Sequence, residues 1–375
     1  MKRFAFWAMV FCIIFALGAP LRASVSETDA LIQLLVQKGL ITPDEAAALR
    51  AELAVQKQEE KDKQKEFQVT ASKPIQLSGY TQARYRDDKS ITDTFDIRRA
   101  RLTLKGGLGK GFDYMFQADF AGSSAKLLDA ALNWTFNDQL ALTTGQFKVP
   151  FSQENLIGDN RMETINRSPV VEALVARGKD VIGNHNGRDI GLMVGGNFTL
   201  LNTPGFLDYA LGVFNGAGTN TTDSNNKKDL VGRLVVHPFK GFSFGGSFYT
   251  GRYTLASALT KEDVRQRAGG EIAYITGPFV FKGEYIHGYD ARVEKDGWYA
   301  LAAYSIVPQK FQAVLKYDTF DPEAAISKNE TKVSTMGFTW FFNKWAQLQV
   351  NYEIKDETGK EISNNALIGQ FQLQF

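Results

Sequence analysis

Basic residues fall on one side of an alternating pattern early in the chain. Arg99, Arg101 and Lys105 stand on this side, and Leu102 and Leu104 stand on the other. A basic side chain that faced lipid at the middle of a bilayer would cost roughly 2–4 kcal/mol, so the basic side is expected to face water. Rings of arginine and lysine along an aqueous path attract anions. A row of cations of this kind could line an aqueous path for anions.

The same alternation assigns further cations to the water-facing side. Arg84 and Arg86 flank Tyr85, which is expected to face lipid, and Arg233 alternates with Leu234. The expected lining cations are Arg84, Arg86, Arg99, Arg101, Lys105, Arg188 and Arg233.

Carboxylates also fall on the water-facing side. Asp113, Asp119 and Asp129 alternate with aromatic residues or leucines, and Glu284 and Glu353 follow the same rule. The lining is therefore expected to carry both signs of charge. Each cation could attract anions or form half of an ion pair that stiffens the lining, and the sequence leaves both interpretations open.

Residues for catalysis or metal binding are scarce. The chain has three histidines, His185, His237 and His287, and one cysteine, Cys12. His237 borders a short connection and His287 a long one, so the two are expected at opposite ends of the fold. No nucleophile elbow or metal-ligand spacing accompanies them. We therefore predict no catalytic residue, no metal site and no cofactor.

From about Leu77 to the C-terminus, apolar residues repeat with a period of two, the spacing of a β-strand. At the end of the chain, Leu367, Phe371, Leu373 and Phe375 alternate mainly with glutamines. No apolar run beyond the N-terminus reaches the roughly 20 residues that a membrane-spanning helix needs. A closed barrel with lipid outside and water inside satisfies this pattern.

The pattern predicts an all-β fold, a sixteen-stranded antiparallel transmembrane β-barrel. An even strand number places both ends of the barrel on one side of the membrane. Short turns alternate with longer polar loops, as expected for the two faces of such a barrel. The expected strands cover residues 77–86, 95–106, 110–121, 126–137, 139–149, 188–201, 206–216, 228–238, 241–252, 265–277, 278–289, 296–307, 308–320, 331–342, 344–356 and 362–375.

One connection, residues 150–187, is far longer than the others, and long ordered loops are usually functional. It contains apolar residues such as Val170 and Leu174 that could anchor it to a wall. Folded into the barrel it would narrow the channel, and the alternative is a loop lying over the mouth. Its candidate site residues are Arg161, Arg167, Arg177 and Lys179.

The N-terminus has the order of a secretory signal peptide over residues 1–23. Lys2 and Arg3 precede an apolar run from Phe4 to Ala19, and Ala23 then offers a small residue for cleavage before Ser24. A membrane anchor is the alternative. Without residues 1–23, 40 basic residues remain against 41 acidic ones, and this balance argues against a nucleic-acid partner.

Residues 24–70 are predicted to form a periplasmic helical segment and charged linker, followed by the barrel from residue 71. Thr42 and Glu45 have the spacing of a capping box at the start of a helix. The segment could be a coiled coil that joins protomers or a solvated helical hairpin on a tether, and its short apolar stripe does not decide between them.

Several segments form motifs found together in a known family. They are Phe95 to Leu102 (FDIRRARL), Asp119 to Gly122, Lys126 to Ala130, Gly145 to Ser152 (GQFKVPFS) followed by Glu154, Asn166 to Ser168, and Gly187 to Gly191. These segments resemble the bacterial phosphate-selective porin O and P family. The similarity extends from about residue 75 to the end of the chain.

The resemblance implies a homotrimer of sixteen-stranded barrels in a Gram-negative outer membrane, surrounded by lipid, with an inward-folded third loop. Founding members conduct phosphate or polyphosphate along lumenal arginines and lysines. Carried over by motif, this favours Arg99 and Arg101 as lumenal cations and residues 150–187 as the constriction loop. Asn166 and Arg167 stand where the family is expected to have Glu-Arg.

We therefore expect an outer-membrane porin, a water-filled channel for passive diffusion of small solutes, with selectivity for anions such as phosphate as one form. A general or weakly selective porin, whose N-terminal helix mainly tethers or trimerises the barrel, is the alternative. An outer-membrane enzyme is a second, more remote alternative.

Overall fold

The computed structural model describes residues 25–66, 75–89, 92–201, 203–223, 225–254, 262–359 and 362–375. The expected signal peptide, residues 1–23, and the last part of the expected linker, residues 67–70, lie outside these ranges. The chain divides into two compact units, residues 1–69 and 70–375, each of which is described by itself.

The N-terminal unit is a helical hairpin of α2 (Val25–Gln37) and α3 (Pro43–Glu66). The connection uses Gly39 in a left-handed conformation with φ of 68°, which suits glycine at a helix end. The predicted capping box is present, because Thr42 Oγ1 accepts from Glu45 N at 3.2 Å and Thr42 N donates to Glu45 Oε2 at 2.7 Å. None of the described helices combines the length and apolar character needed to cross a membrane.

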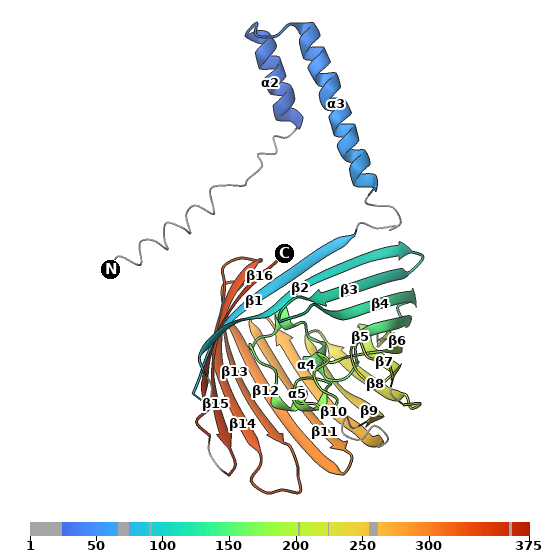
Figure 1. Cartoon of the computed structure of the whole chain (residues 1–375), viewed down its shortest axis with the longest axis vertical. Coiled ribbons are helices and arrows are strands. Elements are labelled where there is room, and N and C mark those ends of the chain that lie inside the picture. Colours follow the sequence, from blue (N-terminus) through green and yellow to red (C-terminus); the bar gives the residue numbers. More distant parts are fainter. Residues whose placement is uncertain are drawn as a thin grey trace, which may run out of the picture. The chain divides into compact units, whose positions relative to one another are not determined.

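The second unit is a closed antiparallel barrel in which, across the described residues, each of sixteen strands pairs with its neighbours in sequence and β1 pairs with β16 (Figure 1). This confirms the predicted strand number and topology. The strands are β1 (Gln76–Asp88), β2 (Thr94–Gly109), β3 (Phe112–Asp119), β4 (Lys126–Asn137), β5 (Leu140–Lys148), β6 (Arg188–Leu200), β7 (Thr203–Phe214), β8 (Asp229–Phe239), β9 (Phe242–Thr254), β10 (Glu262–Thr276), β11 (Phe279–Asp290), β12 (Val293–Val307), β13 (Phe311–Asp321), β14 (Thr331–Phe341), β15 (Ala346–Glu357) and β16 (Ala366–Gln374).

Alternation along each strand separates an apolar outer face from a different inner face. On β13, Leu315 is 63% exposed, whereas its neighbour Lys316 is only 4% exposed. On β16, Leu367 and Leu373 are likewise exposed and Gln370 is buried. Exposed apolar residues thus cover the outside of the barrel, as a lipid-facing surface requires.

The segment between β5 and β6, residues 150–187, lies inside the barrel (Figure 1) and is called the internal loop below. It contains α4 (Gln153–Leu156), a short 3-10 helix η1 (Asp159–Arg161) and α5 (Pro169–Leu174). Helix α5 contacts β11, β12 and β13. Its Val170 and Leu174 belong to one buried apolar cluster with the inward-facing residues Ile286 and Val314.

The outer face gives a first prediction. Leu315→Arg should lower the free energy of unfolding by roughly 2–4 kcal/mol, because it places a charge in lipid near the middle of a strand. Urea unfolding of the protein in phospholipid vesicles, followed by tryptophan fluorescence, measures this difference. Leu315→Phe is the matched control and should change the free energy little. Equal stability of the two variants would contradict a lipid-facing position.

Candidate functional site

The internal loop is fastened to opposite sides of the barrel. Asp159 of the loop pairs with Arg101 on β2 at 2.5 Å, and Asp180 pairs with Arg265 on β10 at 2.8 Å. Strands β2 and β10 are eight strands apart in a ring of sixteen among the described residues, so they lie across the lumen from one another. The loop therefore crosses the interior of the barrel.

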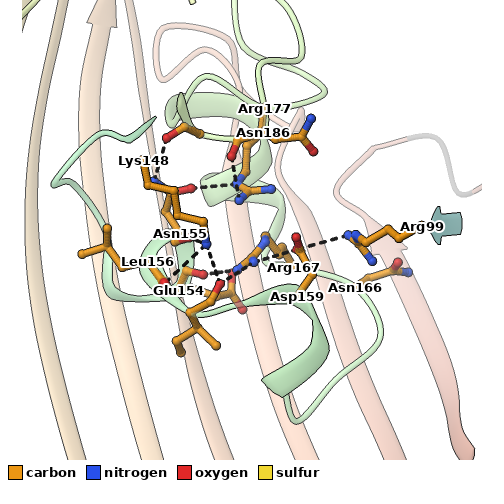
Figure 2. A network of polar contacts seen from close by, with 12 residues as sticks. Arg99, Lys148, Glu154, Asn155, Leu156, Asp159, Asn166, Arg167, Arg177 and Asn186 are labelled. Atoms are coloured by element: carbon orange, nitrogen blue, oxygen red, sulfur yellow. Dashed lines mark hydrogen bonds and ion pairs between the residues drawn. The ribbon is translucent and has the colours of Figure 1, made fainter. Parts of the chain in front are cut away.

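Asp159 is the centre of the first attachment (Figure 2). Its carboxylate oxygens lie 2.8 Å from Arg167 Nη2 and 3.2 Å from Arg99 Nη2, and Figure 2 labels both arginines. They also lie 2.5 Å from Arg101 Nη1. The side chain of Asp159 is fully buried. Burial acts to raise the pKa of this carboxyl group, but Arg99, Arg167 and Arg101 outweigh burial and hold the pKa well below its ordinary value.

The two wall arginines have further partners. Arg101 donates from Nε to Asp119 at 2.8 Å and from Nη1 to the Tyr80 hydroxyl at 2.9 Å. Arg99 donates to Gln82 Oε1 at 2.8 Å. Arg99 and Arg101 thus face the barrel interior, where they hold the internal loop in an ion-pair network.

Other cations expected on the lining also have carboxylate partners. The pairs are Arg84 with Asp96, Arg86 with Asp88, Arg188 with Asp129 at 2.7 Å, and Arg233 with Glu271 at 2.5 Å. A guanidinium held by a carboxylate contributes less to the potential in the lumen than an unpaired one does.

Two expected loop cations are buried and bind the loop's own backbone. Arg167 donates to the carbonyl oxygens of Glu154 and Ile157, the latter at 2.9 Å. Arg177 donates to Asn155 Oδ1 at 3.0 Å and to the Asn186 carbonyl at 3.2 Å (Figure 2). These contacts hold the loop's shape. Arg161 and Lys179 are instead exposed.

A second buried ion pair attaches helix α4 to strand β13. Lys316 on β13 lies 2.8 Å from Glu154 Oε1 and 3.2 Å from Asp318 Oδ1. The second carboxylate oxygen of Glu154 accepts from Ser168 N at 2.8 Å, which joins the two ends of the loop segment before α5. The loop is therefore tied to β13 as well as to β2 and β10.

A cavity of about 570 Å³ remains between α4, η1 and the inner faces of β1, β2 and β3. Its charged lining residues are the cations Arg101, Lys105, Lys148, Arg161 and Arg188 and the carboxylates Asp129 and Asp159. Arg101 and Arg188 are the partners of these carboxylates, so positive charge predominates once the ion pairs are formed.

The exposed cations Lys105 and Arg161 carry this positive charge. Within the part of the chain that the structure describes, Lys105, Lys148 and Arg161 have no carboxylate within ion-pair distance, and Lys105 and Arg161 are exposed. Lys148 Nζ donates to the carbonyl oxygens of Asn155 at 2.7 Å and Ile157 at 2.8 Å (Figure 2). The cavity can thus attract an anion, with Lys105 and Arg161 open to contact it.

Several interior cations were not among the expected ones, including Arg265, Lys282 and Lys316, which hold carboxylates of the internal loop. Arg98 and Lys148 are two more, and each has a local reason for having been missed. A β-bulge on β2 leaves Arg98 without a partner on β1, since Gln82 pairs with Arg99 and Ala83 pairs with Ile97. Arg98 consequently also turns inward and donates to Asn166 Oδ1 at 2.7 Å. Strict alternation would have placed the Arg98 side chain in lipid. A charged residue at a lipid-facing position is thus a sign in the sequence that a bulge interrupts the alternation there.

Lys148 is the second. It is the last residue of β5, where the chain leaves the barrel wall and alternation stops assigning faces. Its only signal in the sequence was the GQFKVPFS motif. As for metal sites, the described residues contain no group of three or more histidine, cysteine or acidic side chains placed to hold an ion.

Comparison with known proteins identifies relatives over most of the chain. A family model described as phosphate-selective porin O and P matches residues 75–262 and 252–375. An uncharacterized protein of Aquifex aeolicus is 24% identical over 416 aligned residues, which cover 92% of this chain and 94% of that protein.

Solved structures share the barrel fold at low sequence identity. An anion-selective porin from Comamonas acidovorans has a TM-score of 0.62 at 14% identity and covers 81% of this chain and 100% of its own. The outer membrane channel DcaP of Acinetobacter baumannii scores 0.57 at 13% identity, covering 82% and 100%. OmpT of Vibrio cholerae in its trimer form scores 0.58 at 10% identity, covering 80% and 99%.

Asp159 provides a test of the attachment. Asp159→Asn should lower the free energy of unfolding by roughly 3–5 kcal/mol, because it leaves three buried guanidinium groups without their shared carboxylate. Urea unfolding measures the loss, and hydrogen exchange of residues 150–187 should rise selectively. Asp223→Asn, which breaks the more exposed pair with Lys228, is the control and should cost at most about 1 kcal/mol.

The contribution of Asp159 to the free energy of unfolding should fall as the pH is lowered. Since the folded-state pKa of Asp159 is held below the unfolded value, its stabilisation is fully present above the unfolded pKa. It is lost as the pH falls through the depressed pKa. Stability of Asp159→Asn should therefore depend less on acid pH than that of the wild type, and parallel acid-unfolding curves would contradict this assignment.

Proposed function

The chain belongs to the phosphate-selective porin O and P family and forms an outer-membrane channel, and from this premise we propose passive diffusion of small solutes with a preference for anions. The observation that carries the preference is the charge balance of the cavity beside the internal loop. Its carboxylates Asp129 and Asp159 are ion-paired, whereas Lys105 and Arg161 are exposed and have no such partner among the described residues.

A cavity in which some cations have carboxylate partners and others do not is suited to conducting anions as well as to selecting them. An ion must be attracted strongly enough to enter a pore and weakly enough to leave it. Two exposed cations provide attraction without enclosing the ion, because the cavity is open to solvent and the neighbouring arginines already have carboxylate partners. Inorganic phosphate, with two or more acceptor oxygens free, is one anion that Lys105 and Arg161 could contact together.

The buried ion pairs of the internal loop favour a constriction of constant width. Moving the loop would separate Asp159 from its arginines and Glu154 from Lys316, all of them buried. Removing one partner from a buried pair typically costs several kcal/mol. The family, the fold and this fixed loop together support a channel without a moving gate rather than an enzyme.

We also propose a homotrimer exported by means of residues 1–23. The hairpin exposes Leu31, Leu34, Leu49 and Leu53, a large apolar share for so small a unit, which favours packing against further copies as a short coiled coil. OmpT of Vibrio cholerae, described as a trimer form, provides the precedent for a trimeric barrel. A solvated hairpin acting as a tether is the alternative.

The hairpin proposal has a direct test. Leu31→Gln combined with Leu34→Gln should reduce the trimer fraction at low protein concentration, since it removes exposed apolar surface that further copies would cover. Native mass spectrometry in detergent measures that fraction. Gln33→Ala combined with Gln37→Ala, on the same helix, is the control. An unchanged trimer fraction would favour the tether.

Anion preference is tested by the reversal potential of single channels in a potassium chloride gradient. Lys105→Gln combined with Arg161→Gln should lower the chloride-to-potassium permeability ratio by roughly threefold to tenfold, where tenfold corresponds to about 1.4 kcal/mol. Lys240→Gln combined with Lys328→Gln removes the same charge from exposed positions in connections outside the cavity and is the matched control. A wild type that prefers potassium would refute the proposal.

A further inference from the structure

The cavity that exposes Lys105 and Arg161 also has an apolar side. Tyr80, Met115, Phe147 and Leu156 line it together with the cations. Met115 lies directly opposite Lys105 in the register of β2 and β3. Directly opposed residues of an antiparallel pair have Cβ atoms about 4.5–5.5 Å apart, so a cation and an apolar side chain stand side by side.

A second cavity of about 450 Å³ supports this arrangement. It shares Lys105, Met115 and Phe147 with the first and continues along the inner faces of β3, β4 and β5, where Asp113 and Asn133 form its polar end. Ala131 extends the apolar surface, because it pairs with Met115 across β3 and β4 and belongs to the same buried cluster as Phe147. The apolar patch therefore spans three neighbouring strands beside the cation.

Met115 differs from the inward-facing apolar residues that α5 covers. Ile286 and Val314 are covered by α5 of the internal loop and are fully or almost fully buried. Met115 is only half-buried and borders open cavity. A path for inorganic ions needs no apolar side chain at this position, since water solvates such ions and apolar surface left in water is unfavourable.

The dimensions also suit a molecule larger than an inorganic anion. A volume of about 570 Å³ lies within the range of roughly 300–1,000 Å³ that small-molecule sites occupy. Such sites combine apolar walls with a few polar groups that orient the ligand. Methionine is also well suited to contact an aromatic ring through its sulfur.

We propose that this cavity is a transit site for small organic anions that join one carboxylate or similar head to an aromatic or short aliphatic body. The head contacts Lys105 and Arg161, and the body lies over Met115 and Phe147. This inference rests on the proposed anion channel and names the substrate class that passes through it. Contact with these two exposed cations and one apolar patch slows such an anion without trapping it.

The test compares benzoate with acetate as inhibitors of chloride current through the full-length protein in planar bilayers. Both carry one carboxylate, and benzoate adds an aromatic ring. Benzoate should halve the current at a concentration roughly fivefold to tenfold lower than acetate, because the ring covers apolar surface. Inorganic phosphate is measured alongside them.

Variants of Met115 test whether this residue causes the stronger inhibition by benzoate. Met115→Gln should bring the two inhibitory concentrations together, and Met115→Leu, which keeps an apolar side chain, should retain the difference. The ratio of benzoate to acetate is taken within each variant, so a general change in conductance cancels. If Met115→Gln does not yield channels, Met115→Thr replaces it.

The outcomes separate the two proposals. A channel that prefers chloride over potassium but responds equally to benzoate and acetate overturns the organic-anion site and leaves the anion channel standing. Inhibition by phosphate at lower concentration than benzoate also overturns it, in favour of an inorganic-anion site. A wild type that prefers potassium refutes the anion channel itself.

Discussion

Every backbone N–H and C=O group that crosses the hydrocarbon region needs a partner within the protein, because lipid offers none. Pairing of β1 with β16 removes the two edges that the sheet would otherwise leave open. Once the sheet is closed, each strand has one face toward lipid and one toward the interior. The alternation of Leu315 with Lys316, and of Leu367 with Ile368, follows from that division.

The interior face is not simply a water-facing surface. Part of it, including Ile286 and Val314, packs against α5, so a miniature apolar core lies inside the barrel. The opposite part carries the arginines that meet Asp159. Charge on the lining is thus largely used to hold the internal loop, and the selectivity of the open space depends on the few cations left outside these pairs. Counting basic residues along the strands would overstate their effect on solutes.

The strands and their faces could be predicted because a period of two needs only local sequence. Arg99, Arg101 and Lys105 were assigned inward for this reason. Arg98 was not, because a bulge changes the alternation by one residue, and its local sign was an arginine on the side expected to face lipid. The contact of Arg101 with Asp159, 58 residues away, was beyond prediction as well. This contact depends on which side chains lie at the same level along the barrel axis and on the path of the internal loop. Neither can be read from a short stretch of sequence.

The internal loop also has a mechanical consequence. A wide barrel is a thin-walled tube, and the lateral pressure of the surrounding lipid acts to flatten it. The loop joins β2 to β10 across the tube through Asp159 and Asp180, and its contact with β13 adds a third point of support. It therefore works as an internal strut that resists deformation of the cross-section from round to oval. Bracing of this kind opposes changes in the width of the bore beside the loop.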